Sequence, residues 1–109
     1  MYEYKANVIS VYDGDTVTLD IDLGCWVWKH SEKCRLFGID TPELRGSERA
    51  DGLVARDRLR ELILGKQVII KTYKDKEGKY GRLLVKIFLD GQNINDLLVE
   101  EGLAEVRFY

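Results

Sequence analysis

Three short stretches of this sequence carry polar side chains whose types and spacing could do chemistry. The first is Asp13-Gly14-Asp15-Thr16, the second runs from Arg35 to Glu43 as RLFGIDTPE, and the third is Lys79-Tyr80-Gly81-Arg82. Each stretch interrupts or follows a run of apolar residues, so each falls where a strand is expected to end. Together the three stretches offer three or four oxygen ligands and two strand-end arginines.

The chemistry of this inventory follows from what each kind of group binds. Carboxylate and carbonyl oxygens without His or Cys favour a hard cation, Ca²⁺ or Mg²⁺. Arginine forks match phosphate oxygens in bidentate fashion. A further carboxylate can take a proton from a water molecule beside the cation. The combination suits hydrolysis of a phosphodiester.

Each stretch also has a purely structural explanation. The Asp-Gly pair at 13–14 is the strongest short signal for a hairpin turn, although a turn does not explain Asp15. The Asp-Thr-Pro run at 40–42 is good chemistry for a helix N-cap, but the residues after Glu43 do not continue a helical stripe. Arg35 could lie at the edge of a sheet with the aliphatic part of its side chain buried. Residues 79–82 could form a solvated loop.

The elements that must position these stretches follow from hydrophobic periodicity. Alternating β-branched and aromatic residues predict strands at 2–12, 16–24, 67–73 and 82–92, with a third strand that returns through Leu36 and Ile39. An apolar face at 55, 59, 62 and 63 predicts a helix over 52–66, with Asp51 as cap and Gly65 after its end. A short helix is expected within 93–106, capped by Asn93 or Asn95 and stopped by Gly102.

The segment 25–39 contains the tryptophans and both cysteines. We expect a turn near His30-Ser31-Glu32, with Trp26 and Trp28 filling one face of an extended hairpin; a surface for a partner or substrate is the alternative. Two Cys and one His are too few for a Cys/His zinc site. Buried or half-buried thiols are expected at Cys25 and Cys34.

The order strand-strand-strand-helix-strand-strand-helix is typical of a five-stranded Greek-key OB barrel, an α+β fold that is mainly β, with two helices. A small open α+β sheet is the competing architecture. The 109 residues suit one domain over 1–109, without repeats or linkers.

Composition narrows the class of protein. The chain is 45% hydrophobic and 33% charged, which predicts a folded domain. It has no apolar run long enough to span a bilayer and no recognisable signal peptide, so we expect a cytoplasmic protein, or a secreted one if a signal was removed. The net charge of −2 argues weakly against bulk nucleic-acid binding. Residues 33–82, however, carry 13 Lys and Arg against 8 Asp and Glu.

Several motifs in one order carry a specific resemblance. They are DGDTVTL at 13–19, RLFGIDTPE at 35–43, Gly52 and Ala55, KYGRLLV at 79–85 and NDLLVEEGLAEV at 95–106. In these motifs the sequence resembles the staphylococcal nuclease (thermonuclease) family. The resemblance implies an OB-like barrel with a Ca²⁺-dependent, sugar-nonspecific nuclease site. Such a site cleaves DNA and RNA, preferably single-stranded, to 3'-phosphate products.

The resemblance also implies residue roles. Asp15 and Asp40 would ligate Ca²⁺ through their side chains and Thr41 through its backbone carbonyl, while Asp13 would support the metal through water. Glu43 would orient or deprotonate the attacking water. Arg35 and Arg82 would clamp the scissile phosphate. Lys79 and Tyr80 would contact the neighbouring phosphate, and Phe108 would stack on a base.

Departures from the family pattern leave an alternative. The chain ends at Tyr109, before the third C-terminal helix of the family's type member. The alternative is a catalytically silent barrel of this kind that binds single-stranded nucleic acid or a protein partner. Silent copies usually lose the acids or one arginine, whereas all of them are present here. The residues therefore favour the enzyme.

Overall fold

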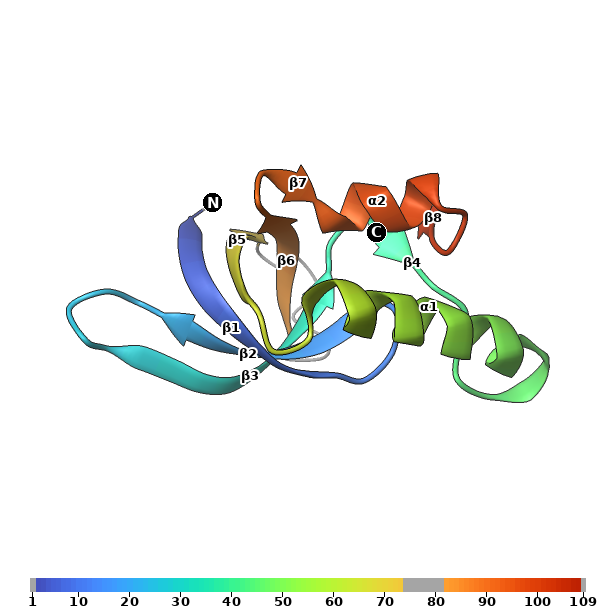
Figure 1. Cartoon of the computed structure of the whole chain (residues 1–109), viewed down its shortest axis with the longest axis horizontal. Helices are drawn as coiled ribbons and strands as arrows, with labels where there is room; N and C mark the ends of the chain where they lie inside the picture. The colour runs from blue at the N-terminus through green and yellow to red at the C-terminus, as the bar shows by residue number, and fades with distance from the viewer. Residues whose placement is uncertain (1, 74–81, 109) are drawn as a thin grey trace.

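The computed structural model describes residues 2–73 and 82–108. Its five long strands are β1 (Glu3–Val11), β2 (Thr16–Asp22), β3 (Trp28–Leu36), β5 (Gln67–Tyr73) and β6 (Leu83–Leu89). They pair side by side in the order β3-β2-β1-β5-β6, and a parallel pairing of β3 with β6 closes the barrel (Figure 1). This strand order is that of a five-stranded Greek-key OB barrel, so the predicted fold class is confirmed.

Shorter elements surround the barrel. A 3₁₀ turn (Gly46–Glu48) leads into helix α1 (Arg49–Ile63), which joins β3 to β5, and helix α2 (Ile94–Glu100) follows β6. Strand β7 (Gln92–Asn93) extends the sheet beside β6. Strand β4 (Ile39–Asp40) pairs with β8 (Glu105–Val106) in a separate two-stranded sheet. This small sheet brings the residues after α2 against the residues after β3.

The core fills the inside of the barrel because the long strands alternate apolar and polar residues. In β2, for example, Val17, Leu19 and Ile21 are buried and the residues between them are not. Leu59 and Ile63 of α1 and Leu98 of α2 join the same cluster. Burying each such side chain contributes about 1.5–3 kcal/mol. The helices are therefore held to the barrel by their apolar faces.

Helix α1 begins three residues before the predicted start and ends at Ile63. The preceding 3₁₀ turn carries the chain into the helix, so the three residues before the predicted start are helical. Asp51 lies in the first turn and Glu48 holds the cap position, so the prediction of Asp51 as the cap is wrong. Gly65 takes the left-handed conformation, with φ of 75°. The prediction for the second helix is confirmed at Asn93, whose side chain accepts the Asp96 N–H.

The turn of the β2–β3 hairpin lies at 24–26 rather than near His30-Ser31-Glu32, so that prediction is wrong. Gly24, Cys25 and Trp26 all have positive φ, and the Asp22 carboxylate accepts the Gly24 N–H at 2.8 Å. Ser31 lies inside β3, where the pairing with β2 shifts by one residue. The polar run that looked like a turn is a bulge in a strand.

This turn changes the expectation for the tryptophans and cysteines. Trp26 stands in the turn and is 97% exposed, while Trp28 stacks on His30, so the two rings do not fill one face together. Both cysteines are free, but Cys25 is exposed rather than buried. Cys34 packs as a core residue, and its burial raises the pKa of the thiol to about 12.

Among the described residues, no helix has the length and hydrophobicity to cross a membrane.

Candidate active site

The turn between β1 and β2 presents the two acids of the first motif. The Asp13 carboxylate accepts the Asp15 N–H at 3.0 Å, and the Asp15 carbonyl accepts the Leu36 N–H at 2.8 Å. The turn is therefore anchored to the end of β3. A Cβ on Gly14 would lie 2.8 Å from Cγ2 of Thr41 and 2.9 Å from Cβ of Ala55. Glycine is needed here because the backbone closely approaches both α1 and Thr41, the residue after β4.

The second motif reaches the same place from the other side. Asp40 is held in β4, and the chain continues through Thr41 to Glu43 against the start of α1. A Cβ on Gly52 would overlap the backbone carbonyl of Glu43. The helix can therefore pack directly on this segment only because residue 52 lacks a side chain.

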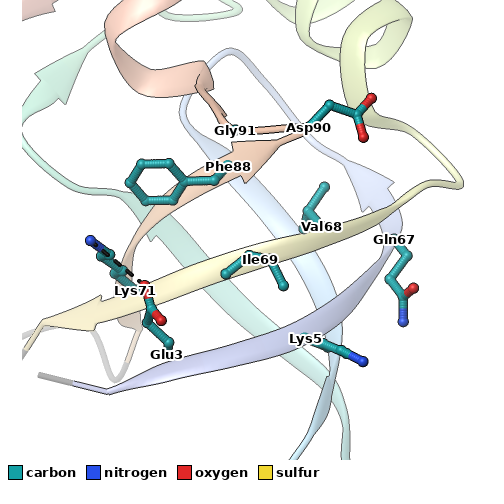
Figure 2. Close-up of a pocket in the computed structure, with 9 residues that line it drawn as sticks. All are labelled: Glu3, Lys5, Gln67, Val68, Ile69, Lys71, Phe88, Asp90 and Gly91. Atoms are coloured by element: carbon teal, nitrogen blue, oxygen red, sulfur yellow. Dashed lines mark ion pairs between the residues drawn. The ribbon is translucent and has the colours of Figure 1, made fainter.

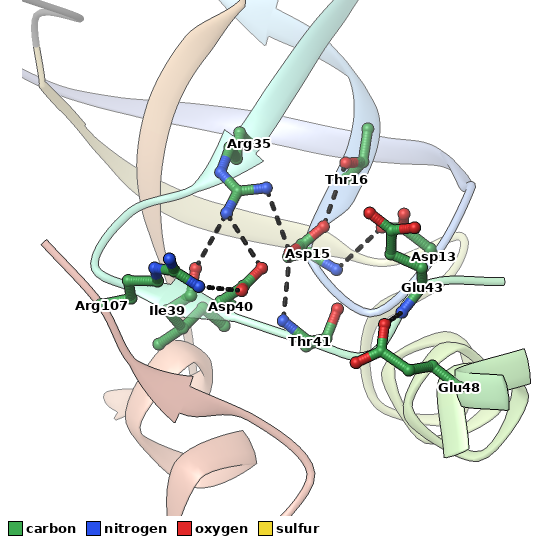
Figure 3. A network of polar contacts seen from close by, with 10 residues as sticks. All are labelled: Asp13, Asp15, Thr16, Arg35, Ile39, Asp40, Thr41, Glu43, Glu48 and Arg107. Carbon is green, nitrogen blue, oxygen red and sulfur yellow. Dashed lines mark hydrogen bonds and ion pairs between the residues drawn. The ribbon is translucent and has the colours of Figure 1, made fainter. Parts of the chain in front are cut away.

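Arg35 joins the two motifs (Figure 3). It lies near the end of β3, paired with Thr16 of β2. Its guanidinium donates to Asp15 Oδ2 at 3.1 Å, to Asp40 Oδ1 at 3.4 Å and to the Ile39 carbonyl at 3.3 Å. One half-buried cation thus bridges two carboxylates that are 25 residues apart in sequence.

Asp15 is the most buried acid of this network, with 4% of its surface exposed. Its carboxylate accepts the Thr41 N–H at 3.2 Å and the Thr16 hydroxyl at 3.3 Å. Burial, and then the neighbouring Asp13 carboxylate, raise the pKa of Asp15 to about 6, although Arg35 and the Thr41 N–H lower it. Additional positive charge beside the Asp15 carboxylate would therefore stabilise its ionised form.

Glu43 lies outside this hydrogen-bonded network. Its carboxylate pairs with Nε of Arg45 at 3.2 Å, and both side chains are largely exposed. Its backbone N–H donates to the Glu48 carboxylate at 3.3 Å (Figure 3). The structure thus brings Asp13, Asp15, Arg35, Asp40 and Thr41 together, with Glu43 on the adjoining segment.

The other predicted residues lie around this cluster or outside the described part of the chain. Arg82 is half-buried and directly precedes β6, whose first residue Leu83 pairs with Cys34, the residue before Arg35. Phe108 is 68% exposed and contacts the ring of Phe37 edge-on at 5.5 Å. Lys79 and Tyr80 fall outside the residues that the structure describes.

One residue of the cluster is absent from the sequence-based site. Arg107 donates to Asp40 Oδ2 at 3.1 Å. It follows β8, and only the pairing of β8 with β4 brings it to Asp40. Its one signal in the sequence is its place beside Phe108, since no local periodicity connects it to an acid far back in the chain.

A hollow of about 480 Å³ lies elsewhere, on the outer surface of β1, β5 and β6 (Figure 2). Its walls include an ion pair between Lys71 and Glu3 and the ring of Phe88. None of the described site candidates lines it. The polar cluster at Asp15 is therefore the better candidate site, because an active site requires polar side chains that converge on one point more than it requires a large cavity.

The capacity of the cluster to hold a metal ion depends on its donor atoms. Among residues 2–73 and 82–108, no three His, Cys, Asp or Glu side chains gather closely enough to hold a metal by themselves. Two carboxylates do share one cation, the Arg35 guanidinium. The buried hydroxyl of Thr41 has no hydrogen-bond partner there. Ca²⁺ accepts carboxylates together with backbone carbonyls and water, so this oxygen-only donor set fits it.

Known proteins share this sequence pattern. The family model described as staphylococcal nuclease homologue matches residues 33–109. The thermonuclease of Staphylococcus hyicus is 31% identical over 110 residues, which cover 98% of this chain and 62% of that protein. The thermonuclease of Staphylococcus intermedius is 31% identical over 102 residues, 91% of this chain and 57% of that protein. Endonuclease YncB of Bacillus subtilis is 30% identical over 100 residues, 88% of this chain and 44% of that protein.

The chain thus spans less than two thirds of the length of these relatives. The family match covers the end of β3, both helices and the later strands, and the longer alignments add β1, β2 and the rest of β3. Together with the closed five-stranded barrel, these matches show that the chain belongs to the staphylococcal nuclease family.

Proposed function

We propose that this chain is a Ca²⁺-dependent, sugar-nonspecific phosphodiesterase that cleaves DNA and RNA, preferably single-stranded, to 3'-phosphate products. The observation that carries the proposal is the Arg35 guanidinium held between the carboxylates of Asp15 and Asp40. In this proposal a cation site and a phosphate-binding group would meet there. The names of the relatives, thermonuclease and endonuclease, support the same reaction class.

The oxygen donors have separate tasks in this proposal. Asp15 and Asp40 would hold Ca²⁺ through their carboxylates and Thr41 through its backbone carbonyl, with Asp13 acting through water. When bound, Ca²⁺ supplies positive charge that polarises a phosphate oxygen and acidifies water. It would also relieve the unfavourable burial of the Asp15 charge, which raises the pKa of that group.

The phosphate would be held by arginine. Guanidinium groups stabilise the charge that develops on phosphate oxygens when the nucleophile attacks. Arg35 and Arg82 would act in this way. Arg35 lies near the end of β3 and Arg82 directly precedes β6, and these two parts of the barrel pair in parallel. Lys79 and Tyr80 would contact the adjoining phosphate, and the exposed ring of Phe108 would stack on a base.

Glu43 would orient or deprotonate the attacking water. Its ion pair with Arg45 joins two exposed side chains, and such pairs contribute only about 0–1 kcal/mol. The carboxylate can therefore leave Arg45 at little cost when substrate binds. General-base catalysis by a positioned carboxylate contributes about 10²–10⁴-fold to the rate.

The test is digestion of denatured DNA and of RNA in Ca²⁺ and in a chelator, with the 3' ends of the products identified. We expect cleavage only in Ca²⁺, and turnover lower by about 10²-fold or more in Arg35→Ala and in Arg82→Ala. Lys66→Ala, which removes a charge after the far end of α1, should cleave normally. Folded protein that binds single strands but does not digest them in Ca²⁺ would instead support the catalytically silent barrel.

A further inference from the structure

Arg107 reaches the Asp40 carboxylate from a segment 67 residues further along the chain. In the β4–β8 ladder, Asp40 lies opposite Glu105 and Ile39 opposite Val106. The Arg107 N–H continues this ladder by donating to the Gly38 carbonyl at 2.9 Å. The contact between the Arg107 guanidinium and Asp40 is therefore set by backbone pairing (Figure 3).

Both oxygens of the Asp40 carboxylate consequently accept from arginine. Arg35 donates to Oδ1 at 3.4 Å, and Arg107 donates to Oδ2 at 3.1 Å. A divalent cation on this carboxylate would repel both guanidiniums and compete with them for the charge of its two oxygens. Binding of the cation to Asp40 therefore favours movement of at least one arginine away from it.

Arg107 is the more exposed of the two arginines. Its side chain is 57% exposed, whereas that of Arg35 is 17% exposed. Arg35 also donates to Asp15 and to the Ile39 carbonyl, so its displacement would disrupt a buried network. The pair between Arg107 and the Asp40 carboxylate is more accessible to solvent, which screens the attraction between the two charges.

We propose that Arg107 changes partner when the cation binds: it holds Asp40 in the free protein and binds a phosphate of the single-stranded substrate in the loaded one. This inference rests on the proposed function. The guanidinium fork matches a phosphate as well as it matches a carboxylate. The next residue, Phe108, presents an exposed ring on which the attached base can stack. Arg107 is thus a substrate-binding residue that also competes with Ca²⁺ for Asp40.

Steady-state kinetics on a short oligothymidylate at saturating Ca²⁺ test the phosphate contact. Arg107→Met keeps the apolar stem and removes the charge, so KM should rise several-fold while kcat changes by less than about twofold. The slope of log kcat/KM against log salt concentration should become shallower by about 0.7, the value for one phosphate contact on a single strand. Arg107→Lys should restore that slope. An unchanged KM and slope in Arg107→Met would overturn the inference.

Calorimetric titration with Ca²⁺ alone tests the competition at Asp40 without any nucleic acid. Arg107→Met should bind Ca²⁺ about twofold to fivefold more tightly than the original protein, since the Arg107 guanidinium no longer competes for the partly exposed Asp40 carboxylate. Lys66→Met removes the same charge elsewhere and should leave the affinity unchanged. Equal affinities in Arg107→Met and the original protein would overturn this inference alone. Absence of Ca²⁺ binding in every protein would overturn the proposed function together with it.

Discussion

At the scale of single residues, the cluster places one acid, Asp15, where it is difficult to ionise. Asp15 is nearly fully buried beside a second carboxylate, and its pKa is raised to about 6. A buried acid of this kind destabilises the fold when it is charged. Such an arrangement is typical of sites in which function, rather than stability, selects the residue.

The pH dependence of stability provides a test of this idea. Because the pKa of Asp15 is about 6 in the folded state, against 3.8 for an ordinary aspartate, the folded state binds more protons between these pH values. The contribution of Asp15 to stability is therefore lost as pH rises from about 4 to 6. A pKa difference of this size corresponds to roughly 3 kcal/mol.

Asp15→Asn removes this titration. Measured in chelator, the melting temperature of Asp15→Asn relative to the original protein should rise by several degrees between pH 4 and pH 6 and then level off. Asp51→Asn, on the exposed side of α1, serves as the control. A difference for Asp15→Asn that stays flat or falls over this range would contradict the raised pKa.

At the scale of elements, two glycines allow the site to assemble. Gly14 brings the β1–β2 turn against Thr41, and Gly52 lets α1 pack on the backbone of Glu43. These contacts set the relative positions of the turn, the strand β4 and the helix. By contrast, the turn of the β2–β3 hairpin, with its exposed Trp26, projects away from the barrel (Figure 1).

Gly52→Ala tests the contact between α1 and Glu43. In an ordinary helix interior this change stabilises by about 1 kcal/mol. Here the new methyl group would overlap the Glu43 carbonyl, so we expect destabilisation of about 1–3 kcal/mol in urea unfolding and a lower rate of cleavage. Val54→Ala on the exposed face of the same helix should change stability by less than about 0.5 kcal/mol. A stabilised Gly52→Ala would show that the contact is absent.

At the scale of the whole molecule, barrel closure depends on a buried amide. The Asn95 side chain accepts the Ile87 N–H at 3.2 Å and donates to the carbonyls of Val85 and Phe37 at 3.1 and 3.0 Å. It thereby ties α2 to β6 and to the segment after β3. The Phe37 N–H also donates to the Val85 carbonyl at 2.7 Å, beside the parallel pairing that closes the barrel.

Asn95→Ala should therefore be much more damaging than removal of the neighbouring cap. It removes the side-chain partner of the Ile87 N–H and of the Phe37 carbonyl, whereas the Val85 carbonyl keeps the Phe37 N–H. Each buried group left without its partner costs about 1–3 kcal/mol, so a total loss of at least about 2 kcal/mol is expected. Asn93→Ala removes the α2 cap and should cost about 1 kcal/mol. Urea unfolding measures both. Equal losses would mean that Asn95 does not hold the barrel closed.

Local patterns in the sequence determined the long strands, both helices and the order that specifies the OB barrel, because alternation and helical periodicity are short-range properties. They also singled out Asp13, Asp15, Arg35, Asp40 and Thr41, which the fold brings together, although the roles of these residues remain predictions. Two predictions from polar composition were wrong. Helix α1 starts earlier than predicted because a 3₁₀ turn precedes it, and the polar run at Ser31 forms a bulge because β3 keeps its pairing with β2.

Only the tertiary structure decided which groups meet. Asp15 and Arg35 are 20 residues apart, and Asp40 and Arg107 are 67 apart, so no local pattern connects them. Strand register brings each pair together, and burial then raises the pKa of Asp15. Arg107 therefore joins the cluster only through the pairing of β8 with β4, since register over such a separation is set by packing of the whole chain.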